Sequence, residues 1–267
     1  MIYQMIGMVK QKSSFIGKGV LSIPKNQLNY LSAPEMIRLI SVHRKQRIAE
    51  KALNRSGIDF RSDDPVVVKR AYSQMTEAQF EAINGRQQFS NWIIIGHSLN
   101  GLVENRPLNV LDVGVGTGTS TKVLANFLPV GSEIIGYDLS PSLVEVARKQ
   151  RYTHRTGREV PTRFIAQSVT DRFQVSDGVP MPDDSIDYIN SSGIIGHHLD
   201  AKQLRQFAKE ARRVLKRGGF LALDEGPAFK AREMSKMMGQ FGFREVKHVR
   251  VARGIAVGQL IFKKMDS

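Results

Sequence analysis

The sequence predicts an α/β protein with a doubly wound, mostly parallel seven-stranded sheet, an antiparallel C-terminal hairpin and an N-terminal helical cap. After Pro107, short apolar runs alternate with amphipathic helical stretches, which is typical of βα units around a parallel sheet. The first of these runs leads directly into a glycine-rich turn and a helix. Before Pro107 the apolar spacing is mainly helical. We therefore expect a helical cap over residues 1–104 and an α/β domain over residues 105–267.

The strands of the expected sheet are short runs bounded by turn residues. In chain order they are Asn109–Val113, Glu133–Tyr137, Arg163–Gln167, Ile186–Asn190, Phe220–Leu223, Arg244–Arg253 and Ile255–Lys263. Helices are expected between them, at Thr119–Leu128, Ser140–Gln150, Ala201–Leu215 and Ala231–Gln240. Because Gly254 joins the last two strands tightly, we expect these strands to pair as an antiparallel hairpin at one edge.

The expected cap contains at least three helical segments. A helical pattern begins at Ser41, and a second helix is expected to start at Asp63-Asp64-Pro65, where a carboxylate caps the first turn and proline occupies it. Thr76 and Gln79 form a capping-box pattern that opens a third helix. Helical character continues from Phe89 to Val103, and we expect these helices to cover a site at the sheet edge.

Composition limits the classes of function that this chain supports. It has 267 residues, no cysteine and a net charge of +14 from 39 basic and 25 acidic residues. Cysteine nucleophiles and thiolate metal sites are thereby excluded, and the spacing of the six histidines predicts no metal site. The absence of cysteine, of a signal peptide and of a membrane-spanning segment favours a cytoplasmic location. The basic charge leaves RNA or an anionic membrane open as a partner. The oligomeric state is left open.

A glycine-rich turn follows the first expected strand, with the sequence Asp112-Val113-Gly114-Val115-Gly116-Thr117-Gly118. Glycines at such a turn let the backbone bend sharply and approach a ligand closely. The dinucleotide pattern G-x-G-x-x-G fails here, because position 119 is threonine, and no Gly-Lys-Ser/Thr follows as in a phosphate-binding P-loop. The second strand ends at Asp138, which is placed to accept hydrogen bonds from both ribose hydroxyls of an adenosine ligand. NAD sites use the same device, so Asp138 alone does not choose the ligand.

The pattern Asp-x-Gly-x-Gly-x-Gly resembles motif I of the class I methyltransferases, which bind S-adenosylmethionine. The resemblance covers roughly residues 105–265, and it includes Ile194 to Leu199 and the turn Arg213 to Gly219. It implies a Rossmann-like methyltransferase fold and S-adenosyl-L-methionine as cofactor. It also implies that Asp112 lies near the methionine ammonium and that Ser168 and Val169 contact adenine. The candidate cofactor contacts within this region are Asp112, Gly114, Gly116, Thr117, Gly118, Asp138, Leu139, Ser168, Val169 and Ser191. Arg86, in the expected cap, is a further candidate, as a partner of the methionine carboxylate.

Three residues are candidates for removing a proton from the methyl acceptor, namely His197, His198 and Glu225. The stretch after the fourth strand, Asn190 to Gly193, lacks the Asn-Pro-Pro-Tyr pattern associated with methylation of nucleobase amino groups. A small-molecule acceptor is therefore the main expectation. RNA, protein or lipid remains the alternative, with the basic surface guiding the substrate. A protein that binds the cofactor without catalysis, or a nucleotide-dependent oxidoreductase, is a further alternative.

Overall fold

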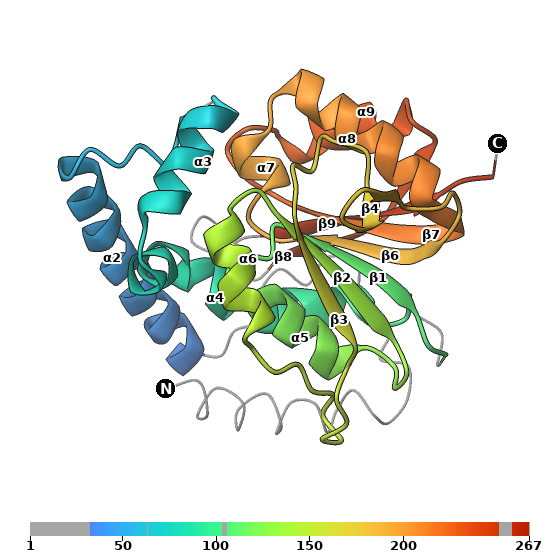
Figure 1. Ribbon diagram of the computed structural model, residues 1–267, viewed down its shortest axis with the longest axis horizontal. Helices are drawn as coiled ribbons and strands as arrows, with labels where there is room; N and C mark the ends of the chain where they lie inside the picture. The colour runs from blue at the N-terminus through green and yellow to red at the C-terminus, as the bar shows by residue number, and fades with distance from the viewer. Residues whose placement is uncertain (1–32, 63, 103–105, 251–257, 267) are drawn as a thin grey trace.

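The computed structural model describes residues 33–62, 64–102, 106–250 and 258–266. Seven strands form one sheet in the order β3-β2-β1-β6-β7-β9-β8 (Figure 1). These are β1 (Asn109–Val113), β2 (Glu133–Asp138), β3 (Thr162–Ala166), β6 (Ile186–Ser191), β7 (Leu215–Asp224), β8 (Phe243–Arg250) and β9 (Gly258–Lys264). Strands β3, β2, β1, β6 and β7 are parallel, and β9 pairs antiparallel with both β7 and β8. The predicted fold class is therefore confirmed.

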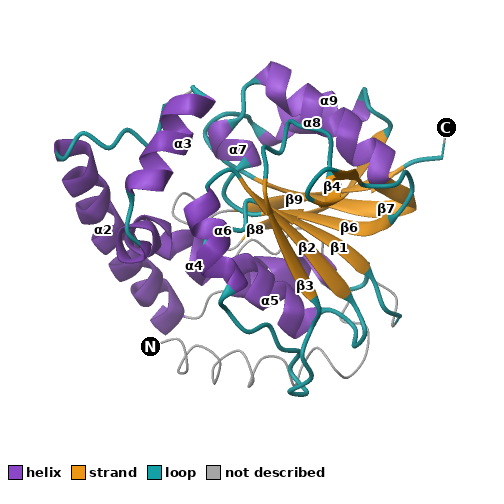
Figure 2. Cartoon of the chain, in the orientation of Figure 1, coloured by secondary structure: helices purple, strands orange, loops and turns teal. Residues whose placement is uncertain are grey.

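Helices cover both faces of the sheet (Figure 2). One face carries α4 (Glu77–Leu99), α5 (Thr119–Phe127) and α6 (Pro141–Arg148), which pack Ile95, Leu124 and Val144 against the strands. The opposite face carries α7 (Ile195–His198), α8 (Ala201–Val214) and α9 (Ala231–Gly239). Strand residues alternate between the two layers, so that Leu111 and Val113 face α8 while Val110 faces α5.

The N-terminal helices form a cap beside the sheet (Figure 1). Helices α2 (Ala33–Arg55) and α3 (Pro65–Gln74) share a small core with the first half of α4, built from Leu53, Phe60, Ala71, Met75 and Ile83. The second half of α4 belongs to the core of the sheet layer. Helix α4 thus ties the cap to the sheet. The first 32 residues of the expected cap lie outside the described residues.

Some elements differ from the sequence prediction. The helix expected from the capping box at Thr76 is α4, which passes through Gly96 without a break but ends at Leu99 rather than at Val103. A side chain at Gly96 would crowd the Phe127 ring, so glycine allows α4 and α5 to approach each other here. Strand β7 starts at Leu215 rather than Phe220, and an irregular register between Ile186 and Tyr188 takes up the extra residues.

Two short elements were not predicted, the two-stranded β4 (Gln174–Ser176) with β5 (Val179–Pro180), and the four-residue helix α7. The antiparallel pairing of the last two strands is confirmed, and β9 takes the inner position of the pair. The turn expected at Gly254 lies outside the described residues.

Candidate functional site

Two adjoining cavities lie at the carboxyl ends of the parallel strands. The first, the sheet-edge cavity, is lined by Gly114, Asp138, Leu139, Ser168 and Val169 from the strand ends, and by Val68, Tyr72, Phe80 and Asn84 from the cap. The second, the cap cavity, has a volume of about 610 Å³ and is lined by residues of all three cap helices together with His197 and His198. Tyr72, Asn84, Gly193 and His198 line both cavities. The two spaces therefore meet at these four residues.

Asp138 ends β2 and is nearly buried at the wall of the sheet-edge cavity. Its Oδ2 accepts the backbone N–H of Gly116 at 2.8 Å, and its Oδ1 accepts that of Ser140 at 2.9 Å. Burial raises the pKa of this carboxyl, against these backbone hydrogen bonds, which lower it. Each carboxylate oxygen accepts more than one donor, so Asp138 can also accept hydroxyl groups from a ligand in the cavity.

The glycine turn lies directly under the cap. Gly116 has a φ of +51°, and a Cβ atom placed there would clash with the Phe80 ring of α4. A Cβ at Gly118 would instead clash with the hydroxyl of Tyr152, whose ring belongs to the core beside α5. The glycines of the motif therefore serve different purposes. Gly116 admits the cap onto the turn, whereas Gly118 lets the core pack behind it.

Asp112 is fully buried and lines neither cavity. Its Oδ2 accepts the hydroxyls of Ser120 at 2.8 Å and Thr121 at 2.7 Å, and its Oδ1 accepts Nδ2 of Asn190 at 2.8 Å. Burial raises its pKa to about 6, against these three hydrogen bonds. Asp112 thus joins β1 to the start of α5 and to β6. Its predicted contact with a methionine ammonium stays a prediction.

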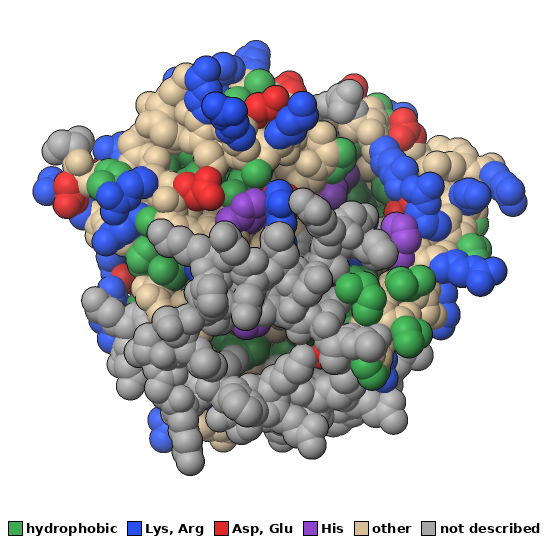
Figure 3. Space-filling view, turned by 180° about the vertical axis from the view of Figure 1, so that it is seen from behind, with side chains coloured by type: hydrophobic (Ala, Val, Ile, Leu, Met, Phe, Trp, Pro, Cys, Tyr) green, Lys and Arg blue, Asp and Glu red, His purple; other side chains and the backbone are tan. Residues whose placement is uncertain are grey.

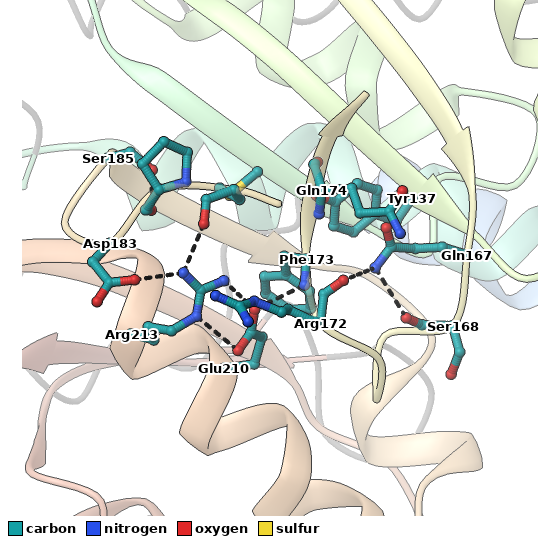
Figure 4. Close-up of polar contacts among 12 residues, drawn as sticks. Tyr137, Gln167, Ser168, Arg172, Phe173, Gln174, Asp183, Ser185, Glu210 and Arg213 are labelled. Carbon is teal, nitrogen blue, oxygen red and sulfur yellow. Dashed lines mark hydrogen bonds and ion pairs between the residues drawn. The ribbon is translucent and has the colours of Figure 1, made fainter. Parts of the chain in front are cut away.

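The loop after β3 forms the far wall of the sheet-edge cavity through Ser168 and Val169. Figure 4 shows how side chains hold it: Gln167 Nε2 donates to the carbonyls of Ser168 and Arg172. In the same view Arg213 of α8 donates to the carbonyl of Met181 and pairs with Asp183 and Glu210. The Ser168 hydroxyl lies 2.8 Å from that of Thr170.

His198 lies where the two cavities meet. Its Nε2 is 3.3 Å from the hydroxyl of Tyr72, a residue 126 positions earlier in the chain. Burial lowers the pKa of His198 to about 4, and the adjacent His197 and Arg61 lower it further, against the opposite effect of Asp224. Burial also raises the pKa of Tyr72. At neutral pH the pair is therefore a neutral imidazole beside a neutral phenol.

His197 lines the cap cavity and is held near an acidic residue that sequence reasoning missed. Asp224, at the end of β7, is fully buried and accepts the backbone N–H groups of Ile195 at 3.2 Å and Gly196 at 3.1 Å. It also accepts the hydroxyl of Ser191 and lies 4.0 Å from Nε2 of His197. Asp224 thus fixes the short helix α7 and the predicted cofactor contact Ser191. Burial lowers the pKa of His197, while Asp224 opposes this.

The Glu225 carboxylate contacts two basic residues of β8. Arg250 donates to both of its carboxylate oxygens, at 2.9 and 2.7 Å, and Nε2 of His248 lies 2.9 Å from Oε1. Burial would raise its pKa, but these two partners lower it to about 2. Among the described residues that line the two cavities, Glu225 is absent. The structure therefore brings the side chains of His197 and His198 together, whereas the Glu225 backbone contacts His197 and the Glu225 carboxylate is held by Arg250 and His248.

The remaining predicted contacts divide between the cavities and the core. Arg86 lines the cap cavity beside Arg61, and burial lowers the pKa of its guanidinium. Gly116, Thr117, Gly118 and Ser191 lie outside the set of described residues that line either cavity. Thr117 is nearly buried, and its hydroxyl makes no hydrogen bond with another described residue. Across the described ranges, no three His, Asp or Glu side chains are grouped so that they could hold a metal ion.

Sequence reasoning missed Phe80, Asn84 and Asp224 as parts of this site. Phe80 and Asn84 lie four residues apart on α4, so they face the same way, and the Asn84 amide donates to the Phe80 carbonyl at 2.9 Å. The capping box at Thr76 predicts a helix, and a spacing of four residues in that helix could have placed Phe80 and Asn84 on one face. Asp224 lies one residue before Glu225, the residue predicted from the sequence. The one feature that sets Asp224 apart from Glu225 is that it is the last residue of β7.

We expect His198 to make folding stability depend on pH. Its pKa falls from an ordinary 6.5 to about 4 on folding, so the folded state resists protonation that the unfolded state accepts between these values. The contribution is complete above pH 6.5 and is lost as the pH falls towards 4, a loss of about 3 kcal/mol. Urea unfolding of the wild type and of His198→Gln at pH 7.5 and 4.5 measures it.

The difference between the two proteins is the quantity to compare, because Asp112 titrates in the same range with the opposite sign. Its raised pKa means that the folded state binds the proton more tightly, so its contribution to stability grows as the pH falls. The wild type should lose stability relative to His198→Gln on acidification. A difference that stays constant between the two pH values contradicts the neutral, buried state of His198.

The chain resembles known methyltransferases in sequence. A family model described as a methyltransferase domain matches residues 110–219. Demethylmenaquinone methyltransferase of Tropheryma whipplei (strain Twist) is 34% identical over 116 residues, which are 43% of this chain and 41% of that protein. The chain thus spans about two fifths of the length of this curated relative.

Solved structures share the fold. Magnesium protoporphyrin IX methyltransferase from Synechocystis PCC 6803, solved with bound S-adenosylmethionine, aligns with a TM-score of 0.54 at 16% identity, over 76% of this chain and 97% of that one. The 1,6-didemethyltoxoflavin-N1-methyltransferase of Burkholderia thailandensis aligns with a TM-score of 0.53 at 17% identity, over 76% and 87% of the two chains. The matched residues include the glycine turn, β1 to β6 and the start of β7. Residues 110–219 thus match a methyltransferase domain model, and the sheet around them has the fold of these solved methyltransferases.

Proposed function

We propose that this chain is an enzyme that transfers a methyl group from S-adenosyl-L-methionine to a small molecule. One observation supports this above the others: the sheet-edge cavity, with the glycine turn and Asp138, adjoins a second cavity through Tyr72, Asn84, Gly193 and His198. A cofactor in the first and an acceptor in the second would meet at these residues. The relatives named above carry menaquinone, porphyrin and toxoflavin precursors in their names, which supports a small acceptor.

The residues of the sheet-edge cavity suit the cofactor. Asp138 offers a carboxylate to the ribose hydroxyls, while Leu139, Val169 and Leu143 give apolar contacts around an adenine ring. Gly114 leaves space at the end of β1, and Ser168 offers a hydroxyl at the far wall. Arg86 is the proposed partner of the methionine carboxylate, reached from the side of the cap cavity. When bound, the cofactor supplies an activated methyl group on a sulfonium.

We propose His198 as the base that removes a proton from the methyl acceptor. Its imidazole is neutral, because burial lowers its pKa to about 4, and it therefore has a free lone pair at neutral pH. Tyr72 orients the ring through its hydroxyl, 3.3 Å from Nε2. His197, fixed near Asp224, is the second candidate. Glu225, held by Arg250 and His248 at a pKa of about 2 and outside both cavity linings, takes no part in proton transfer in this proposal.

The cap excludes water in this proposal. Val68, Tyr72 and Phe80 close one side of the sheet-edge cavity, and α2 adds Gln46 and Glu50 to the cap cavity. We propose residues 1–104 as the cap and residues 105–267 as the methyltransferase domain, with α4 as the shared element. A cytoplasmic location is proposed on the absence of cysteine. RNA, protein or lipid remains the alternative acceptor.

Calorimetric titration with S-adenosylhomocysteine and, separately, with NAD tests the cofactor assignment. We expect binding of S-adenosylhomocysteine only, because the turn lacks the dinucleotide spacing. Hydrogen exchange in the same samples should show protection both in the glycine turn and around residues 72–92. Protection confined to the glycine turn would contradict the proposed role of the cap.

The acceptor class is tested with radiolabelled S-adenosylmethionine and fractionated cell extract. Label should enter the small-molecule fraction, and His198→Gln should reduce its rate by about 100-fold or more while leaving the affinity for S-adenosylhomocysteine nearly unchanged. Label that enters only RNA or protein would contradict the small-molecule proposal but not the cofactor assignment.

A further inference from the structure

Helix α2 buries Leu39 and Leu53, but it also places both of its acidic residues inward and all three of its isoleucines outward. Its two acidic residues, Glu35 and Glu50, are each only 7% exposed, and Gln46 is 8% exposed. Three isoleucines of the same helix face outward, with Ile37, Ile40 and Ile48 being 69%, 50% and 63% exposed. A helix at the surface of a globular domain normally shows the opposite pattern. The isoleucines must therefore be explained by what lies outside the helix.

The inward polar groups have a visible role within the cap. Glu50 accepts from Gln46 at 2.9 Å and pairs with Arg61 at 2.6 Å, and Oε1 of Gln46 accepts the backbone N–H of Arg86 at 3.0 Å. These contacts build one wall of the cap cavity. Glu50 and Gln46 therefore face inward as part of this cavity wall. Nothing within the described chain uses the outward isoleucines in the same way.

The outward isoleucines share one side of α2 with basic residues. We define the α2 outer face as Ile37, Ile40, Arg44, Ile48, Lys51 and Arg55, whose spacing of three or four residues places them on one side of the helix. All six are exposed, and every exposed charged residue of α2 is basic. In Figure 3, Lys and Arg side chains gather on the right-hand edge, the side where α2 lies after the turn from Figure 1. The face therefore combines aliphatic groups with positive charge only.

We propose that the α2 outer face docks this protein on an anionic lipid bilayer. Exposed aliphatic side chains enter the boundary between headgroups and acyl chains, and Arg and Lys beside them contact anionic headgroups. A nucleic acid would match the charge but would leave the isoleucines in water, since it is bound by basic and aromatic groups. Among the described helices, none is long and apolar enough to cross a membrane, so the contact is peripheral.

The position of α2 gives this contact a consequence for the active site. The inner face of α2 lines the cap cavity through Gln46 and Glu50, and a helix with its side chains is about 10 Å across. On a docked protein, the cap cavity lies one helix away from the bilayer surface. The surface contact itself does not depend on methyl transfer, and its test needs no acceptor.

Sedimentation with vesicles tests the docking. We expect the full chain to bind vesicles of phosphatidylcholine and phosphatidylglycerol at 3:1, to bind pure phosphatidylcholine weakly, and to be released as salt rises. The triple variant Ile37→Ser/Ile40→Ser/Ile48→Ser should bind the anionic vesicles at least about tenfold more weakly. Its matched control is Val130→Ser/Val179→Ser, which removes exposed apolar side chains elsewhere and should bind like the wild type.

A pair of charge variants separates a docking face from general attraction. Arg44→Gln/Lys51→Gln/Arg55→Gln should weaken binding by about 100-fold. Arg151→Gln/Arg155→Gln/Arg158→Gln removes the same charge from another exposed segment and should change it little. Affinity for S-adenosylhomocysteine, measured on each variant, reports that the fold is intact and tests the proposed function separately.

Three results would overturn the proposal. Equal loss in both charge variants would show attraction by net charge without a docking face. Retention on RNA that the α2 variants abolish, with no binding to vesicles, would assign the face to nucleic acid. A wild-type dimer that the isoleucine variant converts to a monomer, again with no vesicle binding, would show that the face joins two copies of the chain.

Discussion

Gly116→Val is expected to abolish measurable binding of S-adenosylhomocysteine while most of the protein remains folded. The valine Cβ would clash with the Phe80 ring, which lines the sheet-edge cavity, and would disturb the turn whose N–H is donated to Asp138. A β-branched residue at a φ of +51° is also strained. Together these effects should weaken binding by more than about 100-fold, which corresponds to about 3 kcal/mol. Isothermal titration calorimetry measures the change.

Gly178→Val is the matched control for backbone strain. Gly178 has a φ of +76°, and a Cβ placed there meets no other atom within 4 Å. The two variants should lose similar stability through strain, but only Gly116→Val should lose affinity. A second variant, Phe80→Ala in the Gly116→Val background, removes the ring that the valine would meet. Unchanged affinity in Gly116→Val would show that the glycine turn is not the cofactor site.

Asp112→Ala is expected to reduce the free energy of unfolding by about 3 kcal/mol or more, because it leaves Ser120, Thr121 and Asn190 without their buried acceptor. Its loss would remove the side-chain links from β1 to the start of α5 and to Asn190 of β6. Urea unfolding at pH 7.5, followed by circular dichroism, measures the effect. Burial raises the pKa of the wild-type carboxyl to about 6, so at pH 7.5 the ionised carboxylate accepts all three hydrogen bonds.

Asp112→Asn is the control that separates the two roles of this residue. The amide keeps one acceptor oxygen, and the hydroxyls of Ser120 and Thr121 can rotate to accept from its NH₂ group, so a smaller loss of stability is expected. Affinity for S-adenosylhomocysteine, measured on the folded variant, tests the predicted contact with the methionine ammonium. A large loss of affinity with little loss of stability would show that Asp112 acts on the ligand and not on the fold.

Alternation along β1 explains why Asp112 faces the core. Successive residues of a strand point to opposite faces, so Asp112 lies on the same side as Val110, against α5. Ser120 and Thr121, in the first turn of α5, lie on that side as well. The orientation of Asp112 could be predicted from the sequence, because both the alternation along the strand and the hydroxyl residues Ser120 and Thr121 can be identified there. A comparison of the two could have predicted the hydrogen bonds.

Contacts between distant segments could not be predicted in this way. Tyr72 and His198 lie 126 residues apart, and only the docking of α3 beside α7 brings them together. Glu225 is engaged by Arg250, which β8 presents 25 residues later, after the sheet has placed β9 between β7 and β8. In both pairs, the sequence around one residue does not indicate which residue will contact it.

The sequence by itself determined the order of the βα units, the glycine turn after β1 and the placement of Asp138 at the edge of the sheet. Those features depend on hydrophobic period and turn chemistry, which are local, and on the rule that the carboxyl ends of parallel strands share one edge. Only the tertiary structure decided which polar groups face the cavities. It paired Glu225 with β8 and joined His198 to Tyr72, because the partners of these side chains depend on how segments far apart in the chain pack together.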